Sequence, residues 1–253
     1  MKNKKNNTSA NEFTLNKFLA HAGVASRRKT VEIIKKNLVK VNGKVINDPS
    51  YKVHENDQIT IDGDLITIEE KKYLLLNKPT KIISTVSDEK GRATVVDVIG
   101  DYAKELRLYP VGRLDYETTG LLLLTNDGQL AHQLAHPRFE IKKIYHVTLD
   151  KPVQLKHLEL IKKGVMLEDG KVVVDNITHV SGKPMNHVHI TLHSGKYRIV
   201  RRLFEALGFV VHKLDRINYA GLTKRGLPIG AWRNLRKEEV KKLYLLASKK
   251  IKK

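Results

Sequence analysis

The run of four leucines at 121–124, followed by Thr-Asn-Asp-Gly, constrains this chain more than any other feature. A short apolar run that ends in turn-forming residues is typical of a buried strand. A charged step, Arg113-Leu114-Asp115, stands shortly before the run, with Thr118 and Thr119 between them. Because loops at the ends of rigid strands commonly carry functional groups, Asp115 is a candidate reactive carboxylate.

The residues around Asp115 leave two interpretations open. Asp115 and Arg113 could form a structural ion pair that has no chemical role. Alternatively, the hydroxyls of Thr118 and Thr119 could orient the Asp115 carboxylate for a reaction. The body of the chain favours the second interpretation, because it contains no cysteine, no Ser-His-Asp order, no phosphate-binding loop and no acidic cluster.

The composition predicts a folded protein with one large domain, or one domain and a smaller one. The chain has 253 residues, and 41% of them are hydrophobic, which is enough for a substantial core. The absence of cysteine excludes disulfides and thiolate metal sites and fits a reducing cytoplasm. The opening residues, MKNKKNNTSANEF, lack the apolar stretch of a secretory signal, and no apolar run could span a bilayer. We therefore expect a cytoplasmic protein.

The net charge of +20 at pH 7 indicates a polyanionic partner. A solvated basic surface without a partner is the simpler alternative. An anionic membrane is a weaker one, because the basic residues are spread through globular segments and do not follow one amphipathic helix. Nucleic acid is the favoured partner.

Residues 14–62 show the pattern of a small helical and sheet module. Apolar residues at helical spacing predict a helix from Leu15 to Ala22, and Ser26 is the expected N-cap of a second helix over 27–38. The second helix should bury Val31, Ile34 and Leu38 on one face. Two short strands joined by an Asn42-Gly43 turn follow, and then a third strand over 58–63. Residues 1–13 lack periodicity and are predicted to be a basic tail.

Basic residues gather in this module. Residues 14–46 contain eight lysines and arginines and one acidic residue. Arg27, Arg28 and Lys29 crowd the start of the second helix, where a bound phosphate would relieve their repulsion from the helix dipole. The stretch from Leu15 to Asp62 resembles the S4 RNA-binding domain, including its Ser-Arg and Val-Asn-Gly landmarks. This resemblance implies contacts to structured RNA, for which the candidate residues are Lys17, Arg27, Arg28, Lys29 and Lys44.

A larger body is predicted over 72–246, after a linker at 63–71 that could still be partly strand, and before a basic tail at 247–253. Apolar or alternating stretches at 73–79, 120–125, 142–149 and 187–192 predict strands. Residues 151–165 and 198–208 have helical spacing, and Gly208 should end the second of these helices. Because no regular βαβ repeat connects these elements, we predict an α+β fold with a mixed, largely antiparallel sheet.

The stretch GRLDYETTGLLLLTNDG resembles the signature of the RsuA-type pseudouridine synthases at every fixed position. Further landmarks agree, at 77–79, 143–145, 195–202 and in the pair Leu214 and Arg216. The resemblance implies an isomerase that converts uridine in RNA to pseudouridine without a cofactor. It implies that Asp115 is the nucleophile, and it leaves open addition to the sugar carbon, addition to the base, or help in removing a sugar proton on a glycal route. It also implies that Tyr145 stacks on the base and accepts its C5 proton, and that Arg201 lies opposite Asp115.

Further substrate contacts follow from the same resemblance. Leu214 would pack beneath the base, and Arg113 would hold the RNA or fill the place of the displaced base. The remaining candidate substrate-binding residues are Lys78, Thr118 and Arg198. Simpler interpretations remain for two of these predictions, since Tyr145 could be an ordinary cross-strand aromatic and Leu214 an ordinary core residue.

Two histidine pairs have spacings that could suggest a metal site. His132 and His136 stand four residues apart, and His187 and His189 stand two apart. Neither pair has a third ligand at a suitable spacing, so we expect no metal site.

The family divides by its RNA target. The basic cluster at 25–29, GVMLEDG at 164–170 and GLPIGAWRNL at 226–235 favour the branch that acts on 23S rRNA near the peptidyl transferase centre. Tyr197 is closer to the branch that acts on 16S rRNA. The expected partner is therefore 23S more than 16S rRNA, or a ribosomal subunit precursor, and no membrane. A monomer is the expected state, and a non-catalytic ribosome-assembly factor is the alternative function.

Overall fold

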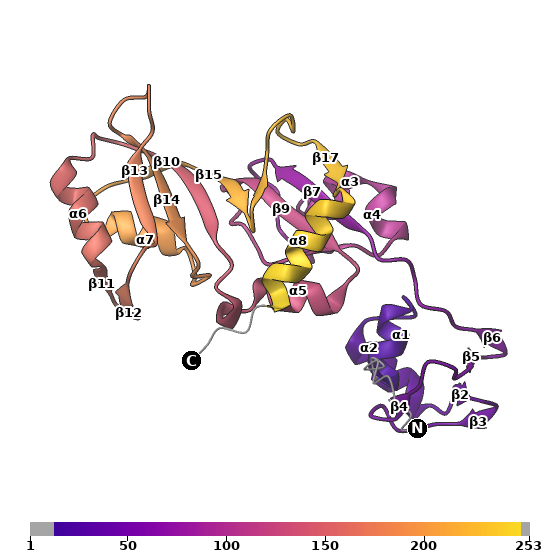
Figure 1. Cartoon of the computed structure of the whole chain (residues 1–253). Coiled ribbons are helices and arrows are strands. Elements are labelled where there is room, and N and C mark those ends of the chain that lie inside the picture. Colours follow the sequence, from indigo (N-terminus) through magenta and orange to yellow (C-terminus); the bar gives the residue numbers. More distant parts are fainter. Residues whose placement is uncertain (1–12, 249–253) are drawn as a thin grey trace, which may run out of the picture. The chain divides into compact units, whose positions relative to one another are not determined.

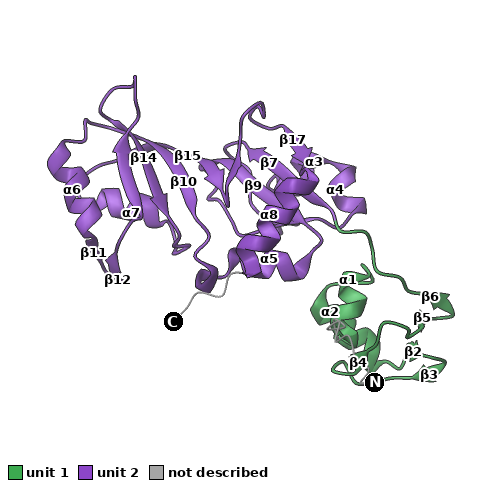
Figure 2. Cartoon of the chain, viewed as in Figure 1, with its two compact units in different colours: residues 1–71 green, residues 72–253 purple. Residues whose placement is uncertain are grey.

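The computed structural model describes residues 13–248, which divide between Lys71 and Lys72 into two compact units (Figure 2). Most of the predicted tails, residues 1–12 and 249–253, lie outside the described residues. No helix within 13–248 is long and apolar enough to cross a membrane.

The first unit contains two helices and six short strands. Their bounds are β1 Phe13–Thr14, α1 Leu15–His21, α2 Arg27–Lys35, β2 Val39–Val41, β3 Lys44–Val45, β4 Lys52–Val53, β5 Ile59–Ile61 and β6 Asp64–Leu65. The first helix buries Leu15, Phe18 and Leu19 against the unit's core, as the helical spacing predicted. The Ser26 side chain accepts a hydrogen bond from the Lys29 backbone N–H, which confirms Ser26 as the N-cap of α2.

The second helix is shorter than predicted. It ends at Lys35, because Asn37 adopts a left-handed conformation with φ of 59° and turns the chain into β2. Ile34 is buried as expected and Val31 is half-buried. Leu38 lies beyond the helix and is exposed, so its predicted place on the buried face was wrong.

The sheet of the first unit has the strand order β3-β2-β5-β6. Asn42 and Gly43 both have positive φ, 50° and 79°, and join β2 to β3 as the predicted hairpin turn. The fourth strand, β6, lies inside the stretch predicted as a linker. It pairs with β5, so the sheet continues to Leu65.

The second unit contains the larger sheet. Its elements are β7 Tyr73–Lys78, α3 Val95–Ile99, α4 Asp101–Glu105, β8 Tyr109–Pro110, β9 Thr119–Thr125, α5 Gly128–Ala135, a 3-10 turn Pro137–Phe139, β10 Lys143–Leu149, α6 Leu155–Lys163, β11 Val165–Leu167, β12 Gly170–Val172, β13 Asn176–His179, β14 His187–Leu192, α7 Ile199–Glu205, β15 Val211–Tyr219, β16 Leu222–Thr223, β17 Trp232–Asn234 and α8 Lys237–Ser248. The last helix runs two residues past the predicted end of this unit and into the segment predicted as a tail.

The main sheet has the strand order β13-β14-β10-β15-β9-β7-β17, with β8 on β9 and β16 on β15. Every pairing is antiparallel except the one between β9 and β15, which is parallel over Thr119–Gly120 and Asp215–Arg216. The prediction of a mixed, largely antiparallel sheet is confirmed. The parallel pairing joins the two halves of the sheet.

The leucine run forms the centre of β9. Leu121 and Leu123 belong to one hydrophobic core, together with residues of α5 and α8, whereas Leu122 and Leu124 belong to the other. Figure 1 shows α5 and α8 beside β7 and β9, and α6 and α7 beside β13 and β14. The four leucines are consecutive because β9 is covered on both faces.

The Asn126-Asp127-Gly128 stretch does more than end the strand. Asp127 is 1% exposed, and its side chain accepts a hydrogen bond from the Leu130 N–H, so it is the N-cap of α5. The expected plain turn is thus the start of a helix that packs against one face of the sheet.

Candidate active site

A cavity of about 250 Å³ opens in the second unit beside Asp115. Its wall combines the loop before β9, the end of α5, the strands β10 and β15, and the segment that leads into α7. Six predicted site residues line it: Arg113, Asp115, Thr118, Tyr145, Arg198 and Leu214. Residues from segments up to a hundred positions apart therefore meet at one site.

The Asp115 carboxylate is half-buried and has no structural partner. Within residues 13–248 it makes no side-chain hydrogen bond and no ion pair, and Arg113 is exposed and does not pair with it. The alternative of a structural Arg113–Asp115 ion pair is therefore wrong. A carboxylate that has no partner in a partly closed cavity makes no contact that stabilises the fold. Its position therefore favours a role in binding or reacting with a ligand.

The two threonines do not orient Asp115 as predicted. The Thr119 hydroxyl donates a hydrogen bond to the Asp215 side chain at 3.0 Å. Thr118 is 1% exposed, and its hydroxyl oxygen has no hydrogen-bond partner in the described part of the chain. Thr118 remains available to a molecule that enters the cavity, which it lines.

Lys78 holds the backbone of the loop that carries Asp115. Its side chain is completely buried at the end of β7, and Nζ donates hydrogen bonds of 2.9 Å to the carbonyl oxygens of Pro79 and Thr118 and one of 3.5 Å to that of Tyr116. Lys78 does not line the cavity, so the structure places this predicted substrate-binding residue behind the loop that carries Asp115. Its hydrogen bonds hold the backbone of that loop.

Ser84 supports the other side of the same loop. Its hydroxyl donates to the Leu114 carbonyl oxygen at 2.9 Å and accepts from the Leu114 N–H at 3.1 Å. Leu114 itself is buried in the core. The residue before Asp115 is thus fixed by packing and by both of its backbone groups.

Burial lowers the pKa of Lys78 to about 8, and the charge of Asp115 opposes this shift. Replacing Asp115 by Asn should therefore lower the pKa of Lys78 further, because it removes the negative charge and leaves the burial unchanged. Carbon-13 NMR of the lysine Cε atoms as a function of pH measures this shift. The variant Asp101→Asn, which changes an exposed carboxylate on α4, is the control, and an unchanged Lys78 pKa in Asp115→Asn would contradict the arrangement.

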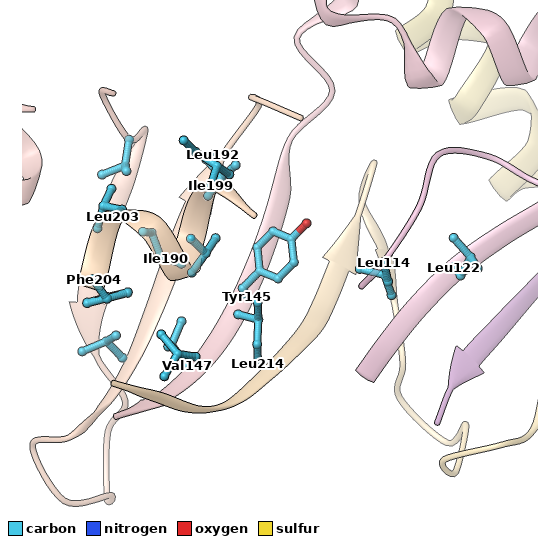
Figure 3. Packing of buried hydrophobic residues seen from close by; sticks show 14 of the residues in the cluster. Leu114, Leu122, Tyr145, Val147, Ile190, Leu192, Ile199, Leu203, Phe204 and Leu214 are labelled. Atoms are coloured by element: carbon cyan, nitrogen blue, oxygen red, sulfur yellow. The ribbon is translucent and has the colours of Figure 1, made fainter. Parts of the chain in front are cut away.

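Tyr145 and Leu214 lie side by side at the edge of the core. They belong to the antiparallel strands β10 and β15, in which Val147 pairs with Leu214 and Tyr145 pairs with Arg216. Figure 3 shows the Tyr145 hydroxyl turned away from Val147 and Leu214. Both residues are core residues, 9% and 5% exposed, and both also line the cavity. The core interpretation and the predicted contact with a base are thus compatible.

Arg201 does not pair with Asp115 in this structure. It is 6% exposed in the first turn of α7, its Nη1 donates to the Val211 carbonyl oxygen at 3.0 Å, and its Nη2 lies 3.7 Å from Glu117 Oε2. The expected Asp115–Arg201 pair is therefore absent from the ion pairs of residues 13–248. The anchoring of Nη1 on β15 turns the guanidinium toward Glu117, two residues after Asp115, and Nε has no partner.

Two cationic side chains line the cavity that the sequence analysis named only as family landmarks, without a function. Lys143 lies two residues before Tyr145, and Arg216 lies two residues after Leu214, and both line the cavity. Strand alternation could have found them, since residues two apart share a face. The sequence could not show that Arg216 is only 2% exposed.

The histidine pairs are placed without metal-site geometry. The rings of His132 and His136 lie 5.3 Å apart, and His187 shares a hydrogen bond of 3.0 Å with His146. No group of three or more His, Asp or Glu residues in the described part of the chain could hold a metal ion.

In the first unit, the five candidate RNA-binding residues are exposed. They are Lys17, Arg27, Arg28, Lys29 and Lys44. No ion pair within the described residues occupies them. Their charges are therefore available to an external anion.

Both units of the chain match known protein families. The profile of the RNA pseudouridylate synthase family matches residues 72–206, and that of the S4 domain matches residues 14–59. The chain is 45% identical, over 92% of its length and 96% of the relative's, to the ribosomal large subunit pseudouridine synthase B of Bacillus subtilis (strain 168). It is 37% identical to the protein of that name from Yersinia pestis, over 87% of this chain and 72% of the relative.

A solved structure agrees with these matches. The crystal structure of a pseudouridylate synthase superposes with a TM-score of 0.63 at 31% identity, over 90% of this chain and 98% of that one. The family profile covers the segment that carries Asp115 and Tyr145, and the relatives cover nearly the whole chain. This chain belongs to the RNA pseudouridylate synthase family and is an RNA pseudouridine synthase, an isomerase, that carries an S4 domain.

Proposed function

We propose that this protein isomerises a specific uridine of 23S rRNA to pseudouridine in the cytoplasm, with Asp115 as the nucleophile. The observation that carries the proposal is the unpaired Asp115 carboxylate, which stands in one cavity with Tyr145 and Leu214. The large-subunit names of the relatives from Bacillus subtilis and Yersinia pestis support 23S rRNA as the target. We propose a monomer that binds free rRNA or a subunit precursor.

The reaction explains why such a cavity is useful. The N1–C1′ bond of uridine breaks, the base rotates, and C5 forms a new bond to C1′ while the C5 proton leaves. A carboxylate without a structural partner is free to act on the nucleotide as a nucleophile. The target base must leave its stack to reach the cavity, where the Tyr145 ring offers a stacking surface and Leu214 an apolar one.

Three arginines and Tyr145 would complete the site. Arg198 and Arg113 line the cavity, where they would contact the phosphates on either side of the extruded nucleotide. Arg201 would pair with Asp115 only after a change of its side chain, since Glu117 holds it in this structure. Tyr145 would accept the C5 proton at the end of the reaction.

The test is the release of tritium from rRNA that contains 5-tritiated uridine, because isomerisation exchanges the C5 proton with water. Separate unmodified 23S and 16S transcripts should be offered to the wild-type protein. Release from 23S rRNA alone is the expected result. Release from 16S rRNA alone would overturn the target; Tyr197, which lines the cavity, is the sequence feature that favours 16S. Binding to both RNAs without release would favour an assembly factor.

We expect the S4 unit to determine the affinity for RNA and not the rate of isomerisation. Neutralising Arg27, Arg28 and Lys29 together with glutamine should reduce the slope of log Kd against log salt by up to about 2–3, because each phosphate contact contributes about 0.7–0.9. The rate at saturating enzyme should not change. Filter binding at several salt concentrations and single-turnover kinetics measure both quantities.

The matched control neutralises three exposed lysines of the second unit, Lys162, Lys163 and Lys241. It removes the same charge from helices α6 and α8. An equal loss of slope in both triple variants would contradict a specific role of the S4 cluster.

A further inference from the structure

Arg216 is a buried cation without a counterion. It is 2% exposed in β15, and its only hydrogen bond within the described residues runs from Nε to the Leu121 carbonyl oxygen at 2.7 Å. Nη2 has no partner, and the guanidinium carbon lies 4.7 Å from the centroid of the Tyr219 ring. Because a buried charge without a counterion is unfavourable, a negatively charged ligand at Nη2 would stabilise this side chain.

Lys143 places a second cation beside it. Its Nζ donates to the His193 carbonyl oxygen at 2.7 Å. Burial, followed by the charge of Arg216, lowers the pKa of Lys143 to about 8. Both residues line the cavity that contains Asp115, and their mutual repulsion would be relieved by a ligand that carries negative charge.

The position of Arg216 indicates which part of a bound nucleotide it would contact, the base or a phosphate. Arg216 pairs with Tyr145 in the ladder and stands two residues after Leu214 on the same face of β15. A base that stacks on Tyr145 and packs on Leu214 presents an edge to Arg216. Phosphates stay with the RNA backbone at the mouth of the cavity, where the exposed Arg113 lies. The almost inaccessible Arg216 is therefore placed to meet the base of a bound nucleotide and not its phosphates.

We propose that Arg216, assisted by Lys143, is a further catalytic residue that contacts the carbonyl oxygens of the uracil and stabilises its negative charge when the glycosidic bond breaks. This inference rests on the proposed function. In every route that detaches the base, the electron pair of the N1–C1′ bond goes to the base. The uracil becomes a monoanion whose charge is shared by N1, O2 and O4, and cationic donors in a closed site stabilise such an anion.

The same two cations serve both halves of the reaction. Rotation of uracil about the axis through N3 and C6 exchanges N1 with C5 and O2 with O4. A donor that contacts one carbonyl oxygen before the rotation thus contacts the other afterwards. An electron pair of the ring then forms the C5–C1′ bond while the bond between C1′ and the Asp115 carboxylate breaks and returns its electron pair to the carboxylate. Loss of the C5 proton gives neutral pseudouridine. Arg216 would hold the anion throughout the rotation.

The test compares 23S transcripts made with uridine or with 5-fluorouridine. Fluorine stabilises the uracil anion, so the fluorinated base needs less help to leave. Arg216→Gln should slow single-turnover consumption of the target uridine by about 10²–10³-fold, the scale on which a preorganised donor acts. Its effect on the target 5-fluorouridine should be at least about tenfold smaller. Mass spectrometry of the released nucleosides measures both reactions.

A second variant tests the same inference independently, and a control variant tests whether loss of any nearby charge has the same effect. Lys143→Gln, at a half-buried position, should show the same substrate-dependent loss and decides the matter if Arg216→Gln does not fold. Lys213→Gln removes one exposed cation of β15 that does not line the cavity, and it should affect both substrates equally. Equal losses for the two RNAs in Arg216→Gln and Lys143→Gln would overturn the inference. A wild type that converts no uridine would overturn the proposed function instead, and this inference with it.

Discussion

Replacing Asp115 by Asn is expected to abolish isomerisation while leaving the fold and RNA binding intact. The carboxylate makes no hydrogen bond or ion pair within the described residues, so the variant loses no structural contact of that group. An amide cannot act as the nucleophile, and the single-turnover rate should fall by at least about 10⁴-fold, the scale seen when a nucleophile is removed. Tritium release from 5-tritiated 23S rRNA measures the rate.

The control for this prediction is Asp101→Asn. It makes the same chemical change at an exposed carboxylate in the first turn of α4, away from the cavity lining. It should retain the wild-type rate. A rate in Asp115→Asn within tenfold of wild type, with unchanged unfolding, would remove Asp115 from the chemistry.

Replacing Gly120 by Ala is expected to destabilise the second unit by at least about 3 kcal/mol, because backbone strain and a backbone clash add up. Gly120 has φ of 106°, and a Cβ there would stand 2.4 Å from the Arg216 carbonyl oxygen and 2.5 Å from the Arg216 nitrogen. The clash falls on the parallel pairing that joins β9 to β15. The variant should therefore also lose activity under conditions in which it is still folded, because Arg216 and the Asp115 loop move apart.

Gly170→Ala separates strain from clash. Gly170 has nearly the same φ, 109°, but no atom lies within 4 Å of its added Cβ. It should cost about 1–2 kcal/mol from backbone strain alone. Urea unfolding followed by circular dichroism gives both free energies. An equal loss of unfolding free energy in Gly120→Ala and Gly170→Ala would show that the close approach of β9 and β15 at Gly120 does not contribute to stability.

Local features of the fold were predictable because neighbouring residues determine them. The leucine run specified a buried strand, Asn42-Gly43 specified a hairpin, and Ser26 specified a helix start. The end of α2 was misplaced, because the left-handed conformation of Asn37 overrides the apolar spacing that continues to Leu38. The linker predicted at 63–71, which the sequence allowed to be partly strand, contains β6.

The site was predictable in its members but not in its contacts. The resemblance to a family named Asp115, Tyr145 and Leu214, and the three residues line one cavity. The partner of Arg201 depends on where α7 lies against β15, and sequence patterns carry no information on that distance. The isolation of Arg216 likewise results from a parallel pairing between segments about 95 residues apart, which no local pattern specifies.

We propose that this chain makes one pseudouridine in 23S rRNA through Asp115. The most direct measurement maps the pseudouridines of rRNA from cells that lack the protein, complemented with wild type or with Asp115→Asn. The expected result is the loss of a single 23S pseudouridine that wild type restores and Asp115→Asn does not, although both proteins accumulate equally. Restoration by Asp115→Asn, or an unchanged 23S map in cells without the protein, would contradict the claim.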